Sequence, residues 1–226
     1  MIRVALTSDR VDKAAPLYRA AGLDPLWLPC IKVEPAPDDV LARARQAVLE
    51  ADVVILSSAR TVDLLWSHHP IPSIDVVAVG AATATAVTGR GGRVILSGDS
   101  GLAGLAAEAG TQLEAARRVV FPRSAHSDPV ALQTIRDLAP GLVEFEVYRT
   151  QPIAPEKSEV RAVAFASPSA VEGWHLTRNL DGLVVGVIGA TTLAAAARYR
   201  HPDVVASHPS HRVLAQALAS HMEVKV

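Results

Sequence analysis

The chain has little of what several protein classes require. Of its 226 residues only Cys30 is a cysteine, so no internal disulfide forms. The net charge is −1, without the clustered Lys and Arg on which nonspecific nucleic-acid binding depends. The longest apolar run, residues 183–197, is interrupted by glycine and threonine and is shorter than the ~20 residues of a membrane span. We therefore expect no nucleic-acid or membrane partner.

Aromatic residues make up only 4% of the chain, although half of all residues are hydrophobic. Alanine and valine supply most of this apolar content, which is typical of parallel strands buried on both faces. The first residues, MIRVALTSDR, lead directly into a strand pattern without the features of a signal peptide. These observations indicate an α/β protein in a reducing compartment, and we expect a cytoplasmic location.

One stretch of the sequence occurs twice, at a constant offset of 109 residues that takes Asp52 to Arg161. DVVILSSARTVDLLW aligns with RAVAFASPSAVEGWH, and VVAVGAATATAV then falls on VGVIGATTLAAA without a gap. Gly80 matches Gly189, and Thr83 matches Thr192. Because each copy of a repeat is one supersecondary unit, the repetition predicts two related lobes with a cleft between them.

The order of the segments predicts how the chain builds these lobes. RVALTSDR at residue 3 and RVVFPRSA at residue 118 echo each other more loosely, and Pro-rich breaks follow each of these units. Proline suits extended crossings better than helix interiors. We expect a discontinuous first lobe (residues 1–34 plus 154–226), a continuous second lobe (38–150), and a hinge near 31–37 and 149–155.

Strand and helix patterns alternate along the chain, which predicts βαβ units and a parallel five-stranded sheet in each lobe, flanked by helices. The predicted strands are residues 2–6, 26–31, 53–56, 76–79, 94–96, 119–121, 142–147, 162–165, 184–188 and 204–206. The predicted helices include residues 11–21, 59–67, 81–88, 102–116, 129–138, 170–178 and 213–221.

The turns that follow these strands carry hydroxyl groups, glycines and a few arginines. Open α/β sheets bind ligands at the carboxyl ends of their strands, so these turns are the candidate substrate-binding site. Each serine or threonine taken alone is more simply explained as a helix cap. Repetition in both halves favours helix N-termini that bind carboxylates or phosphates. The candidates are Thr7, Ser8, Arg10, Ser58, Ala59, Gly80, Thr83, Arg123, Ser124, Ser167, Pro168, Ser169, Gly189, Thr191 and Thr192.

The ordered set of turns resembles the uroporphyrinogen-III synthase family. The motifs are VVILSSARTV, AVAFASPSAV, AVGAAT, VIGATT and EVYRTQP, and the resemblance covers nearly the whole chain. It implies two α/β lobes joined by a two-stranded linker, with hydroxymethylbilane, a linear tetrapyrrole polycarboxylate, bound in the cleft. It also implies ring closure with inversion of the last pyrrole and loss of water, no metal or organic cofactor, and a monomer.

The family residue usually regarded as the acid matches Tyr148 in EVYRT. A phenol is protonated at neutral pH and can donate a hydrogen bond to a departing hydroxyl. A tyrosine at a strand end beside a hinge also often serves only packing. The resemblance implies the catalytic role, in which Tyr148 assists the loss of water.

Other assignments compete with this one. His208 and His211 have the spacing of one helix face, but a zinc site requires three or four ligands. Arg10, Arg60 and Arg123 could each be surface charges, with Arg10 and Arg123 the better candidates for anion binding. A two-lobed binding or regulatory protein for a small polycarboxylate would show the same turns without requiring Tyr148.

Overall fold

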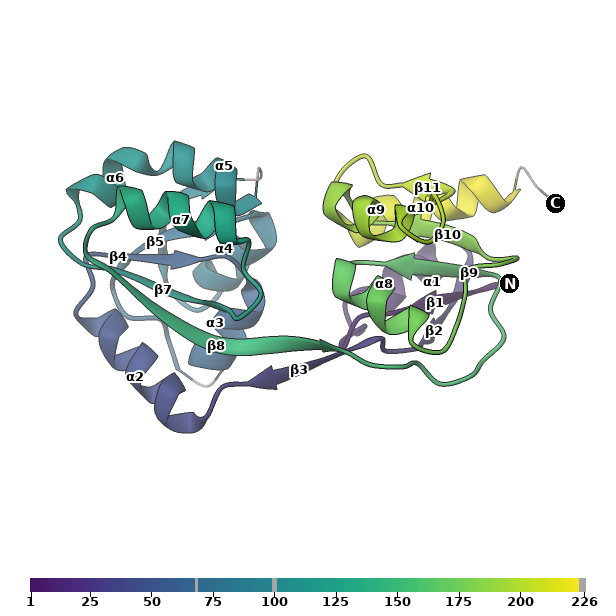
Figure 1. Ribbon diagram of the computed structural model, residues 1–226, viewed down its shortest axis with the longest axis horizontal. Coiled ribbons are helices and arrows are strands. Elements are labelled where there is room, and N and C mark those ends of the chain that lie inside the picture. The colour runs from purple at the N-terminus through teal and green to yellow at the C-terminus, as the bar shows by residue number, and fades with distance from the viewer. Residues whose placement is uncertain (68, 99–100, 224–226) are drawn as a thin grey trace. The chain divides into compact units, whose positions relative to one another are not determined.

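The computed structural model describes residues 1–67, 69–98 and 101–223 (Figure 1). The chain divides into two compact units. Unit 1 comprises Met1–Val33 and Thr150–Val226, and unit 2 comprises Glu34–Arg149. The first strand, β1 (Ile2–Leu6), therefore belongs to a different sheet from β4 (Val53–Leu56).

Unit 1 contains a parallel sheet with the strand order β11-β10-β9-β1-β2. Its strands are β1, β2 (Leu23–Trp27), β9 (Ala162–Phe165), β10 (Val184–Val187) and β11 (Val204–Val205). Its helices are α1 (Ala15–Ala20), α8 (Pro168–His175), α9 (Ala190–Ala197) and α10 (His211–Glu223).

Successive residues of the unit 1 strands enter two separate cores. Val4 and Ala164 pack with α1 and α10, whereas Ala5 and Phe165 pack with α8 and α9. Because side chains alternate across a strand, both faces of the sheet are covered. This is why small aliphatic residues, rather than an apolar/polar alternation, fill these strands.

Unit 2 contains a sheet with the order β3-β8-β7-β4-β5-β6. Its strands are β3 (Ile31–Pro35), β4, β5 (Asp75–Val79), β6 (Arg93–Gly98), β7 (Val119–Ser124) and β8 (Leu142–Pro152). Its helices are α2 (Asp38–Leu49), α3 (Ala59–Trp66), α4 (Ala81–Thr88), α5 (Gly101–Glu108), α6 (Gly110–Ala115) and α7 (Pro129–Leu138). Within unit 2, α5, α6 and α7 cover one face of the sheet, and α2 and α3 lie on the other (Figure 1).

The sheet of unit 2 has six strands among the described residues rather than the expected five. The additional strand is β3, in the Pro-rich crossing, which pairs with β8. The amide of Ala36 donates to the carbonyl of Val147 at 2.9 Å, and that of Ile153 donates to Cys30 at 2.8 Å. Residue numbers rise on one strand as they fall on the other, so the pair is antiparallel.

Several predicted elements differ in their bounds, and three of these differences have a local cause. The helix expected from residue 11 begins at Ala15, next to Pro16, which suits a first helical turn because its missing N–H has no helical partner there. The helix expected over residues 102–116 is divided into α5 and α6 at Ala109, next to Gly110, because glycine weakens helix propensity. The strand expected over 26–31 lies at Leu23–Trp27, directly after a turn at Gly22 with φ +81°.

No described helix is both long and apolar enough to cross a lipid bilayer.

Candidate active site

The repeated turns after β4 and β9 are built alike. In each, a serine in extended conformation precedes the helix, and its hydroxyl accepts a hydrogen bond from a first-turn amide. The distances are 3.1 Å from Arg60 N to Ser58 Oγ and 3.3 Å from Ala170 N to Ser167 Oγ. Both serines therefore cap helices, as side-chain oxygens at this position commonly do. Ala59 and Pro168 open the helices that follow, with Ser169 next in α8.

The second repeated pair of turns, after β5 and β10, begins helices at glycine. Gly80 has φ +79°, a left-handed conformation that other residues rarely adopt, and Gly189 is extended. Thr83 and Thr192 are 3% and 1% exposed, so both side chains face the protein interior. Thr191, in contrast, is exposed. A ligand at these turns would meet backbone groups and Thr191 rather than the buried threonines.

The turn after β1 is tied to its neighbours through side-chain contacts. Thr7 is buried, and its hydroxyl donates to the carbonyl of Ala164 at the end of β9, at 2.9 Å. The carbonyl of Ser8 accepts a hydrogen bond from the indole of Trp27 at 2.9 Å. Arg10 is exposed. Of these predicted residues, Ser8 and Arg10 are accessible at the carboxyl edge of the unit 1 sheet.

Tyr148 lies on β8, in unit 2, and is 8% exposed. It lines a cavity of about 290 Å³ together with Glu34, Glu146 and Arg149. The guanidinium carbon of Arg60, in the first turn of α3, lies 5.8 Å from the centre of the Tyr148 ring. The structure thus brings the predicted acid beside the helix that Ser58 caps.

The contact with Arg60 was missed by the sequence analysis, which considered Arg60 only as a candidate anion ligand or surface charge. Arg60 follows the capping serine by two residues, and this spacing was visible in the sequence. Its approach to Tyr148 joins α3 to β8 across the sheet order β8-β7-β4. No local sequence pattern encodes such a contact.

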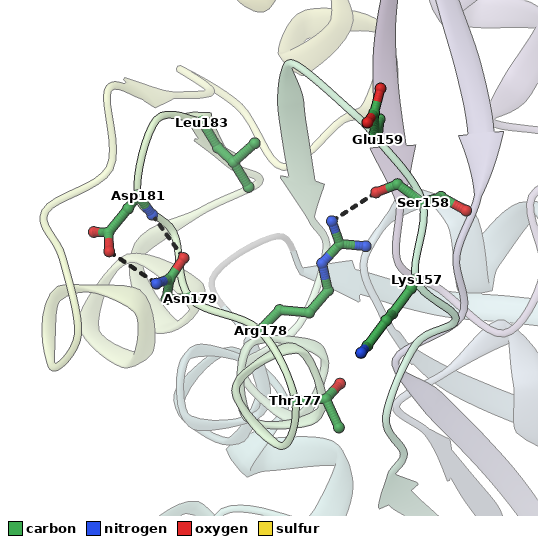
Figure 2. A pocket seen from close by; sticks show the side chains of 8 residues that line it. All are labelled: Lys157, Ser158, Glu159, Thr177, Arg178, Asn179, Asp181 and Leu183. Atoms are coloured by element: carbon green, nitrogen blue, oxygen red, sulfur yellow. Dashed lines mark hydrogen bonds between the residues drawn. The ribbon is translucent and has the colours of Figure 1, made fainter.

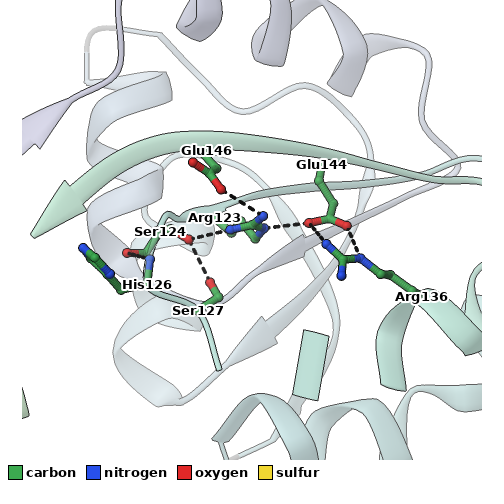
Figure 3. Close-up of polar contacts among 7 residues, drawn as sticks. All are labelled: Arg123, Ser124, His126, Ser127, Arg136, Glu144 and Glu146. Carbon is green, nitrogen blue, oxygen red and sulfur yellow. Dashed lines mark hydrogen bonds and ion pairs between the residues drawn. The ribbon is translucent and has the colours of Figure 1, made fainter. Parts of the chain in front are cut away.

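Arg123 is buried in an ion-pair network at the end of β7 (Figure 3). Its Nε donates to Glu144 at 2.7 Å, its Nη2 to Glu146 at 3.2 Å, and its Nη1 to the carbonyl of Ser124 at 2.9 Å. Arg136 of α7 donates to the two oxygens of Glu144 at 2.7 and 3.2 Å. Burial by itself raises the pKa of Glu144, but the hydrogen bonds from Arg136 and Arg123 outweigh it and lower the pKa below its usual value.

Ser124 has a local role in the same turn. Its hydroxyl accepts a hydrogen bond from the amide of His126 at 3.2 Å, and its carbonyl accepts one from Ser127 Oγ at 3.0 Å. Three acceptors already surround the Arg123 guanidinium. A carboxylate ligand at Arg123 would therefore compete with the protein's own glutamates.

A cavity of about 520 Å³ in unit 1 contains none of the predicted residues (Figure 2). Lys157, Glu159 and Arg178 are among its lining residues. The guanidinium of Arg178 donates to the carbonyl of Ser158 at 2.7 Å and lies 4.4 Å from the centre of the Trp174 ring. The two lining segments directly precede β9 and β10, so this cavity lies at the amino edge of the sheet, opposite the candidate turns.

Across residues 1–67, 69–98 and 101–223, no group of three or more His, Cys, Asp or Glu is arranged to hold a metal ion. His208 is exposed, whereas His211 contacts the ring of Tyr18 edge-on, with 6.1 Å between ring centres. The two histidines therefore have different surroundings.

Together these features define a two-unit α/β protein whose mainly parallel sheets carry serine-capped turns and glycine turns at their carboxyl edges, with a tyrosine on a strand that continues from one unit into the other. The family model described as uroporphyrinogen-III synthase HemD matches residues 12–216. The chain belongs to the uroporphyrinogen-III synthase family.

Solved structures agree with this assignment at the level of the fold. A mutant uroporphyrinogen III synthase from the extremely thermophilic bacterium Thermus thermophilus is 17% identical, with 99% of this chain and 100% of that chain covered and a TM-score of 0.65. The uroporphyrinogen-III synthetase from Helicobacter pylori is 16% identical, with the same coverage and a TM-score of 0.68. No curated protein sequence gives a significant match.

Proposed function

We propose that the chain cyclises hydroxymethylbilane to uroporphyrinogen III, with inversion of ring D and loss of water, as a cyclising lyase of haem biosynthesis. The observation that carries the proposal is the family match, because residues 12–216 include Tyr148 and every candidate turn except the one after β1. The position of Tyr148 in the wall of a cavity supports it further. A titratable group beside a concave site is a reasonable candidate for proton transfer.

Substrate binding in this proposal depends mainly on backbone groups. The substrate is a polyanion, whereas the chain has a net charge of −1. Helix N-termini supply positive potential and N–H donors without basic side chains. The helices that begin at Ala59, Ala81, Pro168 and Ala190 each follow a strand of a parallel sheet. We assign the substrate carboxylates to these turns and to those after β1 and β7.

The chemistry makes modest demands on side chains. The pyrrole nitrogen pushes out the hydroxymethyl oxygen, which takes the phenol proton of Tyr148 and leaves as water, giving an azafulvene. The ring D carbon that already bears the bridge attacks this azafulvene and forms a spiro intermediate. That intermediate fragments, and reclosure joins the other ring D carbon. A proton lost from the pyrrole product restores the phenol. Holding the reacting carbons in one geometry is the enzyme's main contribution.

The assay supplies hydroxymethylbilane enzymatically and separates the oxidised porphyrins by chromatography. We expect the type III isomer in excess over the type I isomer that forms without help. Only the type I isomer, in amounts equal to a protein-free control, would show that the chain is not an active synthase. It would favour a binding or regulatory role instead.

We also propose that the chain acts as a monomer in the cytoplasm. Light scattering of the purified protein checks the first statement, with a mass near 23.8 kDa expected for a monomer. Fractionation of the source cells checks the second.

A further inference from the structure

The pairing of β7 with β8 contains a register break directly before Tyr148. Arg123 pairs with Glu146, but the next residue, Ser124, pairs with Tyr148 rather than with Val147. Val147 is therefore the extra residue of a bulge, and its carbonyl is instead bonded by the amide of Ala36. A bulge redirects the side chains that follow it, and bulges are frequent beside active sites. Here the break places Tyr148, not Val147, opposite Ser124.

Both sides of this break are held by the same arginine (Figure 3). Before the break, Arg123 binds Glu144 and Glu146 on β8. After the break, its Nη1 holds the carbonyl of Ser124, the residue that pairs with Tyr148. Such charge-assisted hydrogen bonds are stronger than neutral ones, and because the Arg123 and Glu144 side chains are only 10% and 19% exposed, solvent weakens the bond between them little.

The turn beyond Ser124 completes the connection. The amide of Ala125 donates to the carbonyl of Tyr148 at 2.9 Å, and Ser127 Oγ donates to the carbonyl of Ser124 at 3.0 Å. On one side of Tyr148, the Glu146 side chain is bonded to Arg123 itself, and on the other the Tyr148 carbonyl is bonded to Ala125, two residues after Arg123. Ala125 and Glu146 also line the cavity in which Tyr148 takes part.

We propose that Arg123, through Glu144, Glu146 and Ser124, is a positioning residue that fixes the bulge and thereby the direction of the Tyr148 phenol. This inference rests on the proposed function, since it assigns the network a purpose in the same reaction. It gives Arg123 a role different from the direct binding of a substrate carboxylate. The network orders the strand before substrate arrives, as a supporting shell does for a catalytic group.

Glu146→Gln tests the proposal without removing the buried arginine. Glu146 is 55% exposed at its side chain, so the variant should fold. The matched control is Glu50→Gln, which removes the same charge from a 53% exposed glutamate paired with Arg118 at 3.2 Å. Glu50 adjoins the amino edge of the same sheet, away from Tyr148. Arg123→Lys is a second variant, which keeps the positive charge but lacks the planar guanidinium that bonds Glu144, Glu146 and the Ser124 carbonyl together.

Two measurements are made on each variant. Labelling with 3-fluorotyrosine gives resonances for Tyr18, Tyr148 and Tyr199, of which the Tyr148 signal is assigned through Tyr148→Phe. We expect Glu146→Gln and Arg123→Lys to shift the Tyr148 signal, and Glu50→Gln to leave it in place. We expect kcat to fall by about 10-fold in Glu146→Gln with KM within about twofold, because small displacements of a reacting group are costly.

The double variant separates positioning from general damage. If Glu146 acts through the phenol, Glu146→Gln should cause no further loss of kcat in a Tyr148→Phe background. An unshifted Tyr148 signal in both variants, or an equal further loss in the double variant, would overturn the proposal. The fluorine measurement needs no turnover, so it decides the positioning role even if the protein forms only the type I isomer, which would refute the proposed function instead.

Discussion

Tyr148 is the one side chain to which the proposed mechanism assigns a chemical step. The phenol lines a cavity, and its ring lies 5.8 Å from the guanidinium carbon of Arg60. A cation over an aromatic face is attractive and helps to hold the ring. The contact also places positive charge beside a group that releases a proton in the proposed mechanism.

We predict that Tyr148→Phe slows turnover by at least ~10-fold, since a positioned general acid contributes ~10²–10⁴. The ring and its packing are kept, so stability should change little. The measurement is kcat for formation of the type III isomer. Tyr199→Phe is the control, because Tyr199 is 53% exposed and stacks on His175 in unit 1. Full activity in Tyr148→Phe would remove the phenol from the mechanism.

His211 makes the stability of unit 1 depend on pH. Burial lowers the pKa of this imidazole below its usual value, and nothing in the described residues hydrogen-bonds its Nδ1. Burial also raises the pKa of the neighbouring Tyr18 phenol, which therefore stays neutral. As pH falls through the ordinary histidine pKa of ~6.5, His211 is protonated in the unfolded chain but stays neutral in the folded chain. Stability is therefore retained above that value and lost as pH falls towards the folded pKa.

We predict that His211→Gln loses less stability than the wild type between about pH 8 and about pH 5.5, the window that spans the ordinary histidine pKa. Urea denaturation at both pH values measures the difference. Replacing the exposed His126 by Gln in the same way should leave the pH dependence unchanged. Equal losses in wild type and His211→Gln would show that His211 does not cause the effect.

The helices and strands show which structural features a sequence pattern can predict. The repeat and its turns predicted strand–turn–helix units correctly, because glycine and capping serines act locally. Two helices have other bounds than predicted because of residues that the sequence already contained. These are Gly110, beside the break between α5 and α6, and Pro16, beside the start of α1 at Ala15. The prediction followed the helical pattern of apolar residues across both positions. The bulge at Val147 has no such local signal, since it arises from the pairing of two strands.

The same limit applies to the predicted site residues. Ser58 and Ser167 were identified because a cap is encoded within four residues. Arg123 was considered as an anion ligand or a surface charge because its partners, Glu144 and Glu146, lie on another strand. Pairing across strands depends on register, which the apolar pattern of a doubly buried sheet does not specify.

Helix α8 approaches the backbone of the Pro-rich segments closely at Gly173. A Cβ added at Gly173 would overlap the carbonyl oxygen of Cys30 and lie 2.8 Å from that of Ile153. We predict that Gly173→Ala destabilises the protein by about 3 kcal/mol, as overpacking against fixed backbone does. Chemical denaturation compares it with Glu172→Ala, an exposed change on the same helix. Equal stability of the two variants would mean that the helix can move away from the crossing.

The whole molecule combines a nearly neutral chain with a polyanionic substrate. In the proposed mode of binding, helix N-termini supply the positive potential that the net charge lacks, because every βα turn at the carboxyl edge of a parallel sheet presents one. Repeating the unit supplies several such turns without adding net charge. A composition that argues against nucleic-acid binding is therefore compatible with an anionic small molecule.

The chain order makes the two units unequal as folding units. Unit 2 is continuous, and its core cluster, which includes Ile55, Phe121 and Ile135, lies within it. Unit 1 depends on both ends of the chain, since β1 pairs with β2 on one side and with β9 on the other. Its core joins Val4 and Tyr18 from the first segment to Leu214 from the last.

We predict that residues 34–149 alone unfold cooperatively, because a domain with its own hydrophobic core can fold independently. Residues 1–33 alone should remain unfolded, and should gain helical and strand signal in circular dichroism only when mixed with residues 150–226. The reverse result, a folded 1–33 segment or an unfolded 34–149 segment, would contradict the division into these two units. Partial folding of residues 150–226 alone is compatible with it only if adding residues 1–33 raises the cooperativity of unfolding, because β1 lies between β2 and β9 in the sheet and α1 packs in the same core as α10.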